Sequence, residues 1–298
     1  MIQLVECEGA PRDLGLDQGT QCRTALNAAY RRQSRWQRAR LHLRAGSDAC
    51  RQARLEIRRF YPQQAEMIDA MARAARVPVP WLVAILIGQF RPVPRAEALV
   101  LAAARAMTNR GALLARALPG GVIVRRSRPE NGFRSIELTQ PWRADPLAGV
   151  NEAGLAVACV SSFGEIAQSR HVVPAALLTH DCLRRFDSLD GAIDWLMARP
   201  GGGKSTFVLA DLAGEIAGVT VDGDDRRIFR PADDLFVHTG GHARQTEIEK
   251  GLREASPLVA SDLGRFIGMP LVVVEPSRQS IGLLSGWSTG EVDRWFEV

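Results

Sequence analysis

The chain has 298 residues, of which 46% are hydrophobic and 24% are charged, with a formal net charge of +5 at pH 7. These proportions are typical of a soluble globular protein. The most apolar segment, residues 79–90, is too short to cross a bilayer and predicts a buried helix, which excludes a membrane-spanning chain. We expect no membrane partner.

The start of the chain has no basic stretch followed by an apolar run, so we expect no signal peptide. The five cysteines are odd in number, scattered along the chain and without a CxxC pair. We therefore expect reduced thiols in a cytoplasmic protein, with neither a disulfide framework nor a zinc site.

Nearly all of the positive charge comes from arginine, and the heaviest run spans residues 31–59. One interpretation is a docking face for an acidic partner, a nucleic acid or a phosphate-bearing cofactor. The other is a solvated helical face. No interleaved aromatic pattern or nucleic-acid motif accompanies the run, which favours the solvated face, and we expect no nucleic-acid partner.

In chain order, alternation predicts a strand over residues 2–9, then a mainly helical stretch to about residue 61 and an apolar-faced helix over 63–75. From Leu99 onward the pattern changes to a period of two with frequent glycine turns.

The second part of the chain predicts many short strands and two groups of helices. The strands are expected at 104–108, 112–118, 122–126, 135–139, 148–150, 155–160, 206–210, 216–221, 235–238, 271–275 and 280–284. The helices are expected at 173–186, 188–198, 244–254 and 257–267. This order predicts an α+β protein with sheets packed face to face and helices outside. We expect one domain over 1–298, with a mainly helical part over 1–98 and a sheet sandwich over 99–298.

We do not interpret either of two local patterns as a binding site. Residues 200–206 (PGGGKST) match the end of a phosphate-binding loop, but they follow a predicted helix and precede a strand, the reverse of the required context. The segment HTGGH at 238–242 offers two histidines without further ligands, so we expect no metal site. The chain also lacks a GxSxG nucleophile elbow.

Eight segments in the right order resemble the isopenicillin N acyltransferase-like (peptidase C45-like) family of N-terminal-nucleophile (Ntn) hydrolases. They are 9–19 (GAPRDLGLDQG), 113–121 (LLARALPGG), 124–139, 149–157 (GVNEAGLAV), 173–196, 206–221, 236–241 (FVHTGG) and 271–286. The resemblance implies a four-layer αββα Ntn-hydrolase sandwich with an N-terminal helical segment. It implies no cofactor.

Members of that family cut themselves before a cysteine, whose freed amine then serves as the base for acyl transfer. Aligning RAMTNRG places Met107 at that cysteine, and a thioether cannot act as the nucleophile. Arg116 matches an arginine of the family's motif, and the resemblance implies that it is a catalytic residue. It places Ala117, Pro119 and Gly240 where the family has asparagine, aspartate and an oxyanion-binding asparagine.

Thr108 is the remaining candidate nucleophile, although side chains alternate across a strand and a one-residue shift turns it to the opposite face. The resemblance also places Met107, Asn109, Asn151, Glu152, His238 and Thr239 around the cleft.

Two functions stay open at this point. The first is a pseudoenzyme that binds a small amide or acyl ligand. The second is an amide hydrolase or acyltransferase of specialised metabolism that uses Thr108 or a rebuilt site. Acyl-carrier-protein or coenzyme A thioesters are candidate donors, and both are anionic, which suits an arginine-rich face. The sequence leaves a homo-oligomer open.

Overall fold

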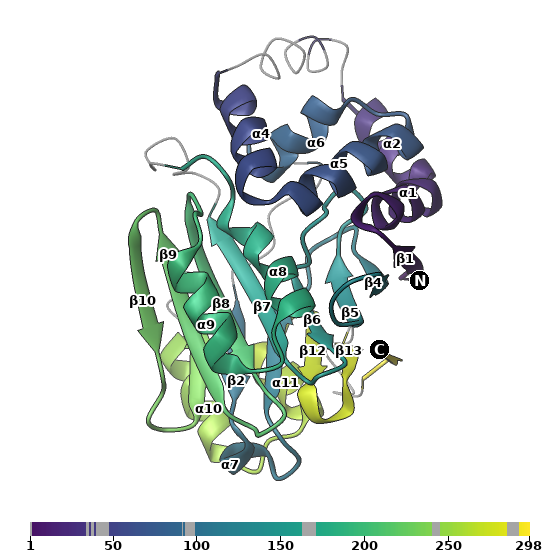
Figure 1. Cartoon of the computed structure of the whole chain (residues 1–298). Coiled ribbons are helices and arrows are strands. Elements are labelled where there is room, and N and C mark those ends of the chain that lie inside the picture. Colours follow the sequence, from purple (N-terminus) through teal and green to yellow (C-terminus); the bar gives the residue numbers. More distant parts are fainter. Residues whose placement is uncertain are drawn as a thin grey trace.

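The computed structural model of the chain describes residues 2–33, 36, 39, 48–90, 92, 99–162, 171–239, 245–284 and 292–298. Two β-sheets face each other, and helices cover the outer face of each sheet, which makes a four-layer αββα sandwich (Figure 1). A group of N-terminal helices packs at one end of this sandwich.

Sheet A has eight strands within the described residues. In sheet order they are β1 (Leu4–Gly9), β4 (Ile123–Pro129), β5 (Ser135–Thr139), β6 (Ala148–Asn151), β7 (Ala156–Ser162), β8 (Lys204–Ala210), β9 (Ile216–Asp222) and β10 (Asp225–Phe229). β1 pairs parallel with β4, and the other neighbours are antiparallel.

Sheet B has six described strands, all antiparallel to their neighbours. In sheet order they are β11 (Leu235–His238), β2 (Val100–Ala103), β3 (Leu113–Ala117), β12 (Leu271–Glu275), β13 (Ser280–Leu284) and β14 (Arg294–Glu297). The hairpin of β2 and β3 lies inside the sheet, flanked by β11 and β12.

The helices fall into three groups. The N-terminal group is α1 (Pro11–Gln21), α2 (Arg23–Arg31), α4 (Asp48–Phe60), α5 (Pro62–Ala75) and α6 (Val79–Leu86). The short helix η2 (Ala175–Leu177) leads into α8 (Leu178–Arg185) and α9 (Leu189–Ala198) on sheet A, and α10 (Gln245–Glu254) and α11 (Ala260–Ile267) cover sheet B. Two single turns, α7 (Arg105–Thr108) and η3 (Pro276–Arg278), sit in loops.

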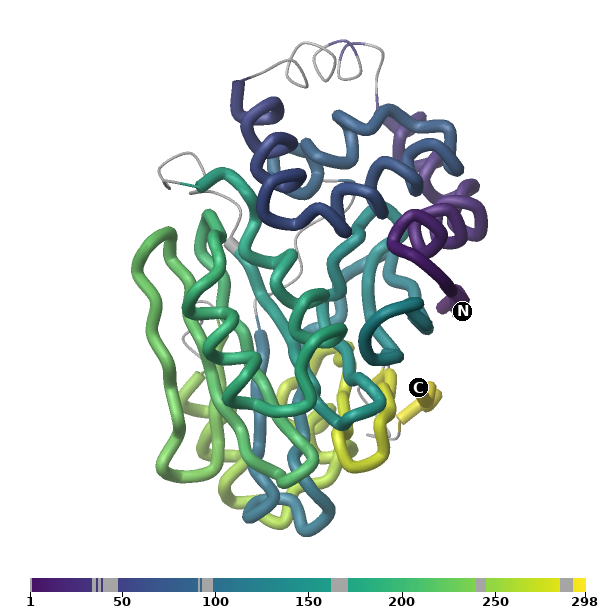
Figure 2. The backbone as a smooth tube through the Cα atoms, viewed as in Figure 1, coloured from purple at the N-terminus to yellow at the C-terminus, as the bar shows by residue number. Residues whose placement is uncertain are grey.

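Three hydrophobic layers hold the sandwich together. One lies between the helices and sheet A and continues into the N-terminal helices. The second lies between the two sheets and consists mainly of Val, Ala, Leu and Ile side chains. The third lies between sheet B and helices α10 and α11. The two ends of the chain lie on the same side of the molecule, where Arg126 of β4 donates to the Glu297 carbonyl at 3.1 and 2.9 Å (Figure 2).

The predicted α+β class and αββα layering are confirmed, but one predicted strand is wrong. Residues 104–108 do not form a strand: the strand is β2, Val100–Ala103, and Arg105–Thr108 forms the helical turn α7. Every residue of β2 is buried, so its two faces show no polar–apolar alternation that would mark its position in the sequence. The strands β10 and β14 were not predicted, and both are short edge strands.

The structure also bears on the expectations for residues 200–206, for the cysteines and for a membrane span. Residues 200–206 connect the end of α9 to β8, as expected, and Lys204 forms an ion pair with Asp222 at 3.7 Å. All five cysteines are buried free thiols. No helix in the described part of the chain combines the length and apolarity needed to cross a membrane.

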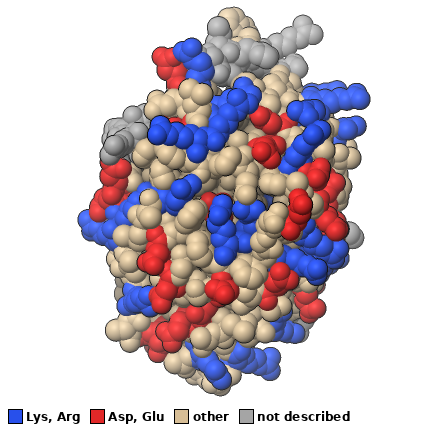
Figure 3. Space-filling model, in the orientation of Figure 1, with Lys and Arg blue, Asp and Glu red and all other residues tan. Residues whose placement is uncertain are grey.

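Part of the arginine-rich run lies outside the described residues, but helix α4 shows how some of it is used. Arg54 and Arg58 approach the Asp69 carboxylate of α5 at 3.6 and 3.0 Å, and Arg51 pairs with Asp48. On the face seen in Figure 3, basic and acidic side chains are interspersed. These contacts favour a solvated, ion-paired helical face.

Candidate functional site

The β2–β3 hairpin of sheet B brings three residues into one row. Arg116 of β3 is in register with Val100 of β2, and Val100 is in register with His238 of β11. Directly opposite residues of antiparallel strands place their side chains on the same face. Val100 belongs to the hydrophobic layer between the sheets, so Arg116 and His238 face sheet A as well.

Arg116 is held by main-chain carbonyls. Its Nε donates to the carbonyl of Cys159 on β7 at 2.8 Å, and its Nη1 donates to the carbonyl of the next residue, Ala117, at 2.9 Å. No carboxylate of the described residues forms an ion pair with this guanidinium. Burial lowers the pKa of Arg116 to about 10. The site therefore contains a fixed positive charge between the sheets.

A second buried arginine lies near Arg116. Arg143, in the loop between β5 and β6, forms an ion pair with Asp145, and the exposed fractions of the two side chains are 7% and 0%. Asp145 accepts through Oδ2, while Oδ1 is buried without a hydrogen-bond partner in the described structure. Neither Arg143 nor Asp145 was singled out from the sequence, because no motif marks an ion pair formed two residues apart within an irregular loop.

His238 lies at the end of β11, with Nε2 3.3 Å from Thr206 Oγ1 on β8. Burial lowers the pKa of His238, and the nearby Lys204 lowers it further. The next residue, Thr239, is buried and places Oγ1 3.4 Å from Gln245 Oε1 at the start of α10. Thr239 therefore faces the helix layer, whereas His238 faces sheet A. Gly240 lies outside the described residues.

Met107 does not lie in a cleft between the sheets, which corrects the expected register. Its side chain is buried in the hydrophobic layer between sheet B and helices α10 and α11, and its carbonyl accepts from Leu258 N at 2.7 Å. Ala117 faces the same outer layer. Met107 is a packing residue.

Thr108 and Asn109 lie at the turn end of the hairpin, opposite the end that carries Arg116. The Thr108 hydroxyl donates to the carbonyl of Gly111 and so closes the turn that connects α7 to β3. Asn109 adopts the left-handed conformation with φ of 54°. Arg116 and Thr108 are therefore not brought together.

Asn151 and Glu152 have structural contacts. The Asn151 amide donates to the carbonyls of Leu183 and Phe186 at 2.8 and 2.7 Å, which fixes the β6–β7 turn to α8. Glu152 accepts from the main-chain amide of Arg134 at 3.0 Å. These contacts give Asn151 and Glu152 structural roles in holding the β6–β7 turn.

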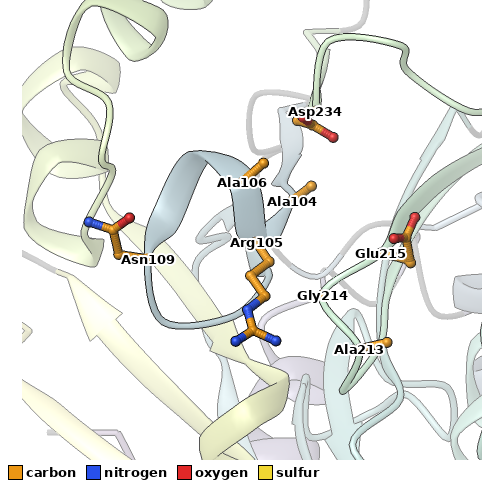
Figure 4. Close-up of a pocket in the computed structure, with 8 residues that line it drawn as sticks. All are labelled: Ala104, Arg105, Ala106, Asn109, Ala213, Gly214, Glu215 and Asp234. Atoms are coloured by element: carbon orange, nitrogen blue, oxygen red, sulfur yellow. The ribbon is translucent and has the colours of Figure 1, made fainter.

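A hollow with a volume of about 500 Å³ opens at the α7 end of the sandwich. Figure 4 shows its lining: α7 and the residues around it, the turn between β8 and β9, and Asp234 before β11. Of the predicted cleft residues, Asn109 lines this hollow. Among the described residues, no cluster of three or more His, Cys, Asp or Glu side chains has metal-binding geometry.

No protein-family model matches the sequence, and no curated protein sequence matches it either. Solved structures do match. A Caenorhabditis elegans N-acylethanolamine-hydrolysing acid amidase orthologue is similar with a TM-score of 0.51 at 12% identity, covering 60% of this chain and 93% of the amidase chain.

Two further solved structures are similar at lower scores. For the penicillin V acylase of Agrobacterium tumefaciens the TM-score is 0.46 at 13% identity, with 63% and 84% of the two chains covered. For a mutant conjugated bile acid hydrolase of Clostridium perfringens it is 0.43 at 8% identity, with 66% and 91% covered.

The layer order, the inner β2–β3 hairpin and the match to the amidase define the class of fold. The chain has the αββα fold of the Ntn hydrolases.

Proposed function

We propose that this chain is a pseudoenzyme of the Ntn-hydrolase fold, which binds a small amide or acyl ligand and does not cleave it. One observation carries the proposal: the strand position that faces Arg116 is occupied by Val100. Within residues 91–107 the sequence contains no Cys, Ser or Thr.

The chemistry requires more than an arginine. Ntn catalysis needs a nucleophilic hydroxyl or thiol whose own freed amine acts as the base. If Arg116 corresponds to the retained arginine of the family, its partner strand should present that nucleophile. A valine side chain has neither a lone pair nor a proton to transfer, so the hairpin lacks the reacting group.

The amide hydrolase alternative depends on Thr108. Its hydroxyl already donates to Gly111, and the β2–β3 register separates it from Arg116 by the length of the hairpin. A strand residue rises about 3.3 Å, so the three steps from Val100 to Ala103 put roughly 10 Å between the two ends of β2. We therefore do not assign catalysis to Thr108.

The proposed ligand class follows from the positive charge between the sheets and from the fold's neighbours. Arg116, which has no carboxylate partner among the described residues, favours an anionic group, such as a carboxylate, or the phosphates of an acyl thioester on coenzyme A or a carrier protein. We propose a cytoplasmic role in specialised metabolism. The C. elegans amidase hydrolyses N-acylethanolamines, which makes these amides the first probes to try.

The test compares turnover and binding of the same compounds. Purified protein is incubated with N-palmitoylethanolamine and with palmitoyl-coenzyme A, and product release and ligand-induced thermal stabilisation are both measured. We expect stabilisation by at least one compound and no product above the buffer rate. Thr108→Val should leave both readouts unchanged.

Arg116→Met should weaken binding by about tenfold, which corresponds to about 1.4 kcal/mol. If the methionine variant is poorly folded, Arg116→Lys is used as a second variant because it retains the charge. The control is Arg134→Met, which removes an exposed arginine. Product formation that is abolished by Thr108→Val would contradict the proposal. The proposal would also be contradicted if none of these compounds stabilised the protein.

A further inference from the structure

The hollow beside α7 is far from the Arg116 row, because it opens at the other end of the β2–β3 hairpin. Its volume of about 500 Å³ falls within the range of about 300–1,000 Å³ typical of small-molecule sites. The resemblance places one of its lining residues, Asn109, around the cleft, but the proposed pseudoenzyme function assigns no role to the hollow.

The frame of this hollow is fixed by main-chain hydrogen bonds between separate segments. The amide of Ala104 donates to the Asp234 carbonyl at 2.8 Å, and the amide of Arg105 donates to the Gly214 carbonyl at 2.9 Å. Asp211 Oδ1 accepts from the amides of Gly214 and Glu215, both at 3.1 Å, and so closes the β8–β9 turn. The charged side chains therefore project from a rigid frame.

Three charged side chains line the hollow: Arg105 and Glu215 are exposed, and Asp234 is half-buried. Within the described residues, Arg105, Glu215 and Asp234 form no ion pair or side-chain hydrogen bond with the protein. In Figure 4 the two carboxylates lie on one side of the hollow, whereas the Arg105 guanidinium extends away from them. The alanines 104, 106 and 213 leave the space between them open.

Because the two carboxylates and the guanidinium lie apart, the hollow suits a ligand that carries both a positive and a negative group. An ammonium group fits between two carboxylates, and a carboxylate fits a guanidinium, which it binds in bidentate geometry. We propose that the hollow is a binding site for a small zwitterion, namely an amino acid or a dipeptide. Its ammonium lies against Glu215 and Asp234, and its carboxylate lies against Arg105.

The test is isothermal titration calorimetry of the full chain with glycylglycine and L-alanine. Putrescine and acetate, which carry only one kind of charge, are titrated in parallel. We expect at least one zwitterion to bind, and each single-charge compound to bind at least about tenfold more weakly, because each of them can pair with only one of the two kinds of charge in the hollow.

Two isosteric variants, Glu215→Gln and Asp234→Asn, and the shorter neutral variant Arg105→Gln remove the charges. Asp234 has φ of 59°, and asparagine tolerates this left-handed conformation as readily as aspartate does. Each variant should weaken zwitterion binding by about tenfold. The matched controls are Asp225→Asn, in the exposed β9–β10 hairpin, and Arg110→Gln, at an exposed position that does not line the hollow. Both should leave zwitterion binding unchanged.

Absence of binding by both zwitterions would overturn the proposal. Equal binding of putrescine, unaffected by Arg105→Gln, would also overturn it and would indicate a cation site instead. Catalysis does not enter these measurements, so their outcome is independent of the pseudoenzyme assignment.

Discussion

His180 of α8 is buried against both the helical part and sheet A. Its Nδ1 lies 3.5 Å from Gln64 Nε2, and burial lowers its pKa to about 3 from the ordinary value of 6.5. Arg125 and Arg184 lower the pKa as well, whereas Asp181 and Asp145 raise it. A histidine in this position remains neutral in the folded protein at mildly acidic pH.

The pKa of His180 predicts acid destabilisation. Between pH 6.5 and about 3 the unfolded chain binds a proton at this histidine and the folded chain does not, so stability falls as pH falls. The contribution is at most about 1.4 kcal/mol per pH unit from this one group. Urea unfolding of wild type and His180→Gln between pH 7 and 4.5 measures it. We expect a smaller fall in the variant, and equal slopes would contradict the assigned pKa.

At the scale of elements, the first glycine-rich segment has a packing explanation. Gly15 and Gly19 of α1 face α5 so closely that added Cβ atoms would lie 2.2 Å from the Met67 carbonyl oxygen and 2.5 Å from that of Met71. Gly9, with φ of 106°, adopts a conformation that other residues rarely take. The motif at 9–19 therefore sets how closely α1 approaches α5.

Gly15→Ala should destabilise the protein although alanine favours a helix. The clash with main-chain atoms of α5 forces the helices apart, and overpacking of this kind costs about 1–3 kcal/mol. Gly120→Ala is the control, because an added Cβ there meets nothing within 4 Å. Thermal unfolding of the two variants is the measurement. A Gly15→Ala variant as stable as Gly120→Ala would show that α1 does not pack on α5 in this way.

The element scale also shows what the sequence could and could not predict. Helices with an apolar stripe, such as α5, and strands with alternation, such as β1, follow from their patterns. The β2 strand was misplaced because Val100–Ala103 is buried on both faces and shows no alternation. The charges that line the α7 hollow come from three distant segments, and only the fold brings them together.

At the scale of the whole molecule, a buried polar network joins the N-terminal helices to sheet A. Arg125 of β4 forms an ion pair with Glu137 of β5 and donates to Gln18 Oε1 at 2.6 Å. The Gln18 side chain of α1 in turn donates to the carbonyls of Pro141 and Arg143 at 3.2 and 2.9 Å. β1 also pairs directly with β4, so the helical part and the sandwich share one sheet.

Removal of Arg125 should affect both parts at once. Arg125→Met leaves the buried Glu137 carboxylate without its counter-charge, which costs about 3–5 kcal/mol. The double variant Arg125→Met with Glu137→Met removes both charges and should recover much of that loss. Urea unfolding followed by circular dichroism measures the stability. A double variant less stable than the single one would contradict the role of the uncompensated charge.

The intact mass of the purified 298-residue chain tests the pseudoenzyme assignment most directly. The account predicts a single species of 32.6 kDa after prolonged incubation, because neither Val100 nor Met107 can attack the preceding carbonyl. Two fragments that meet anywhere between residues 99 and 108 would show self-cleavage on the β2–α7 segment, and would contradict the loss of catalysis.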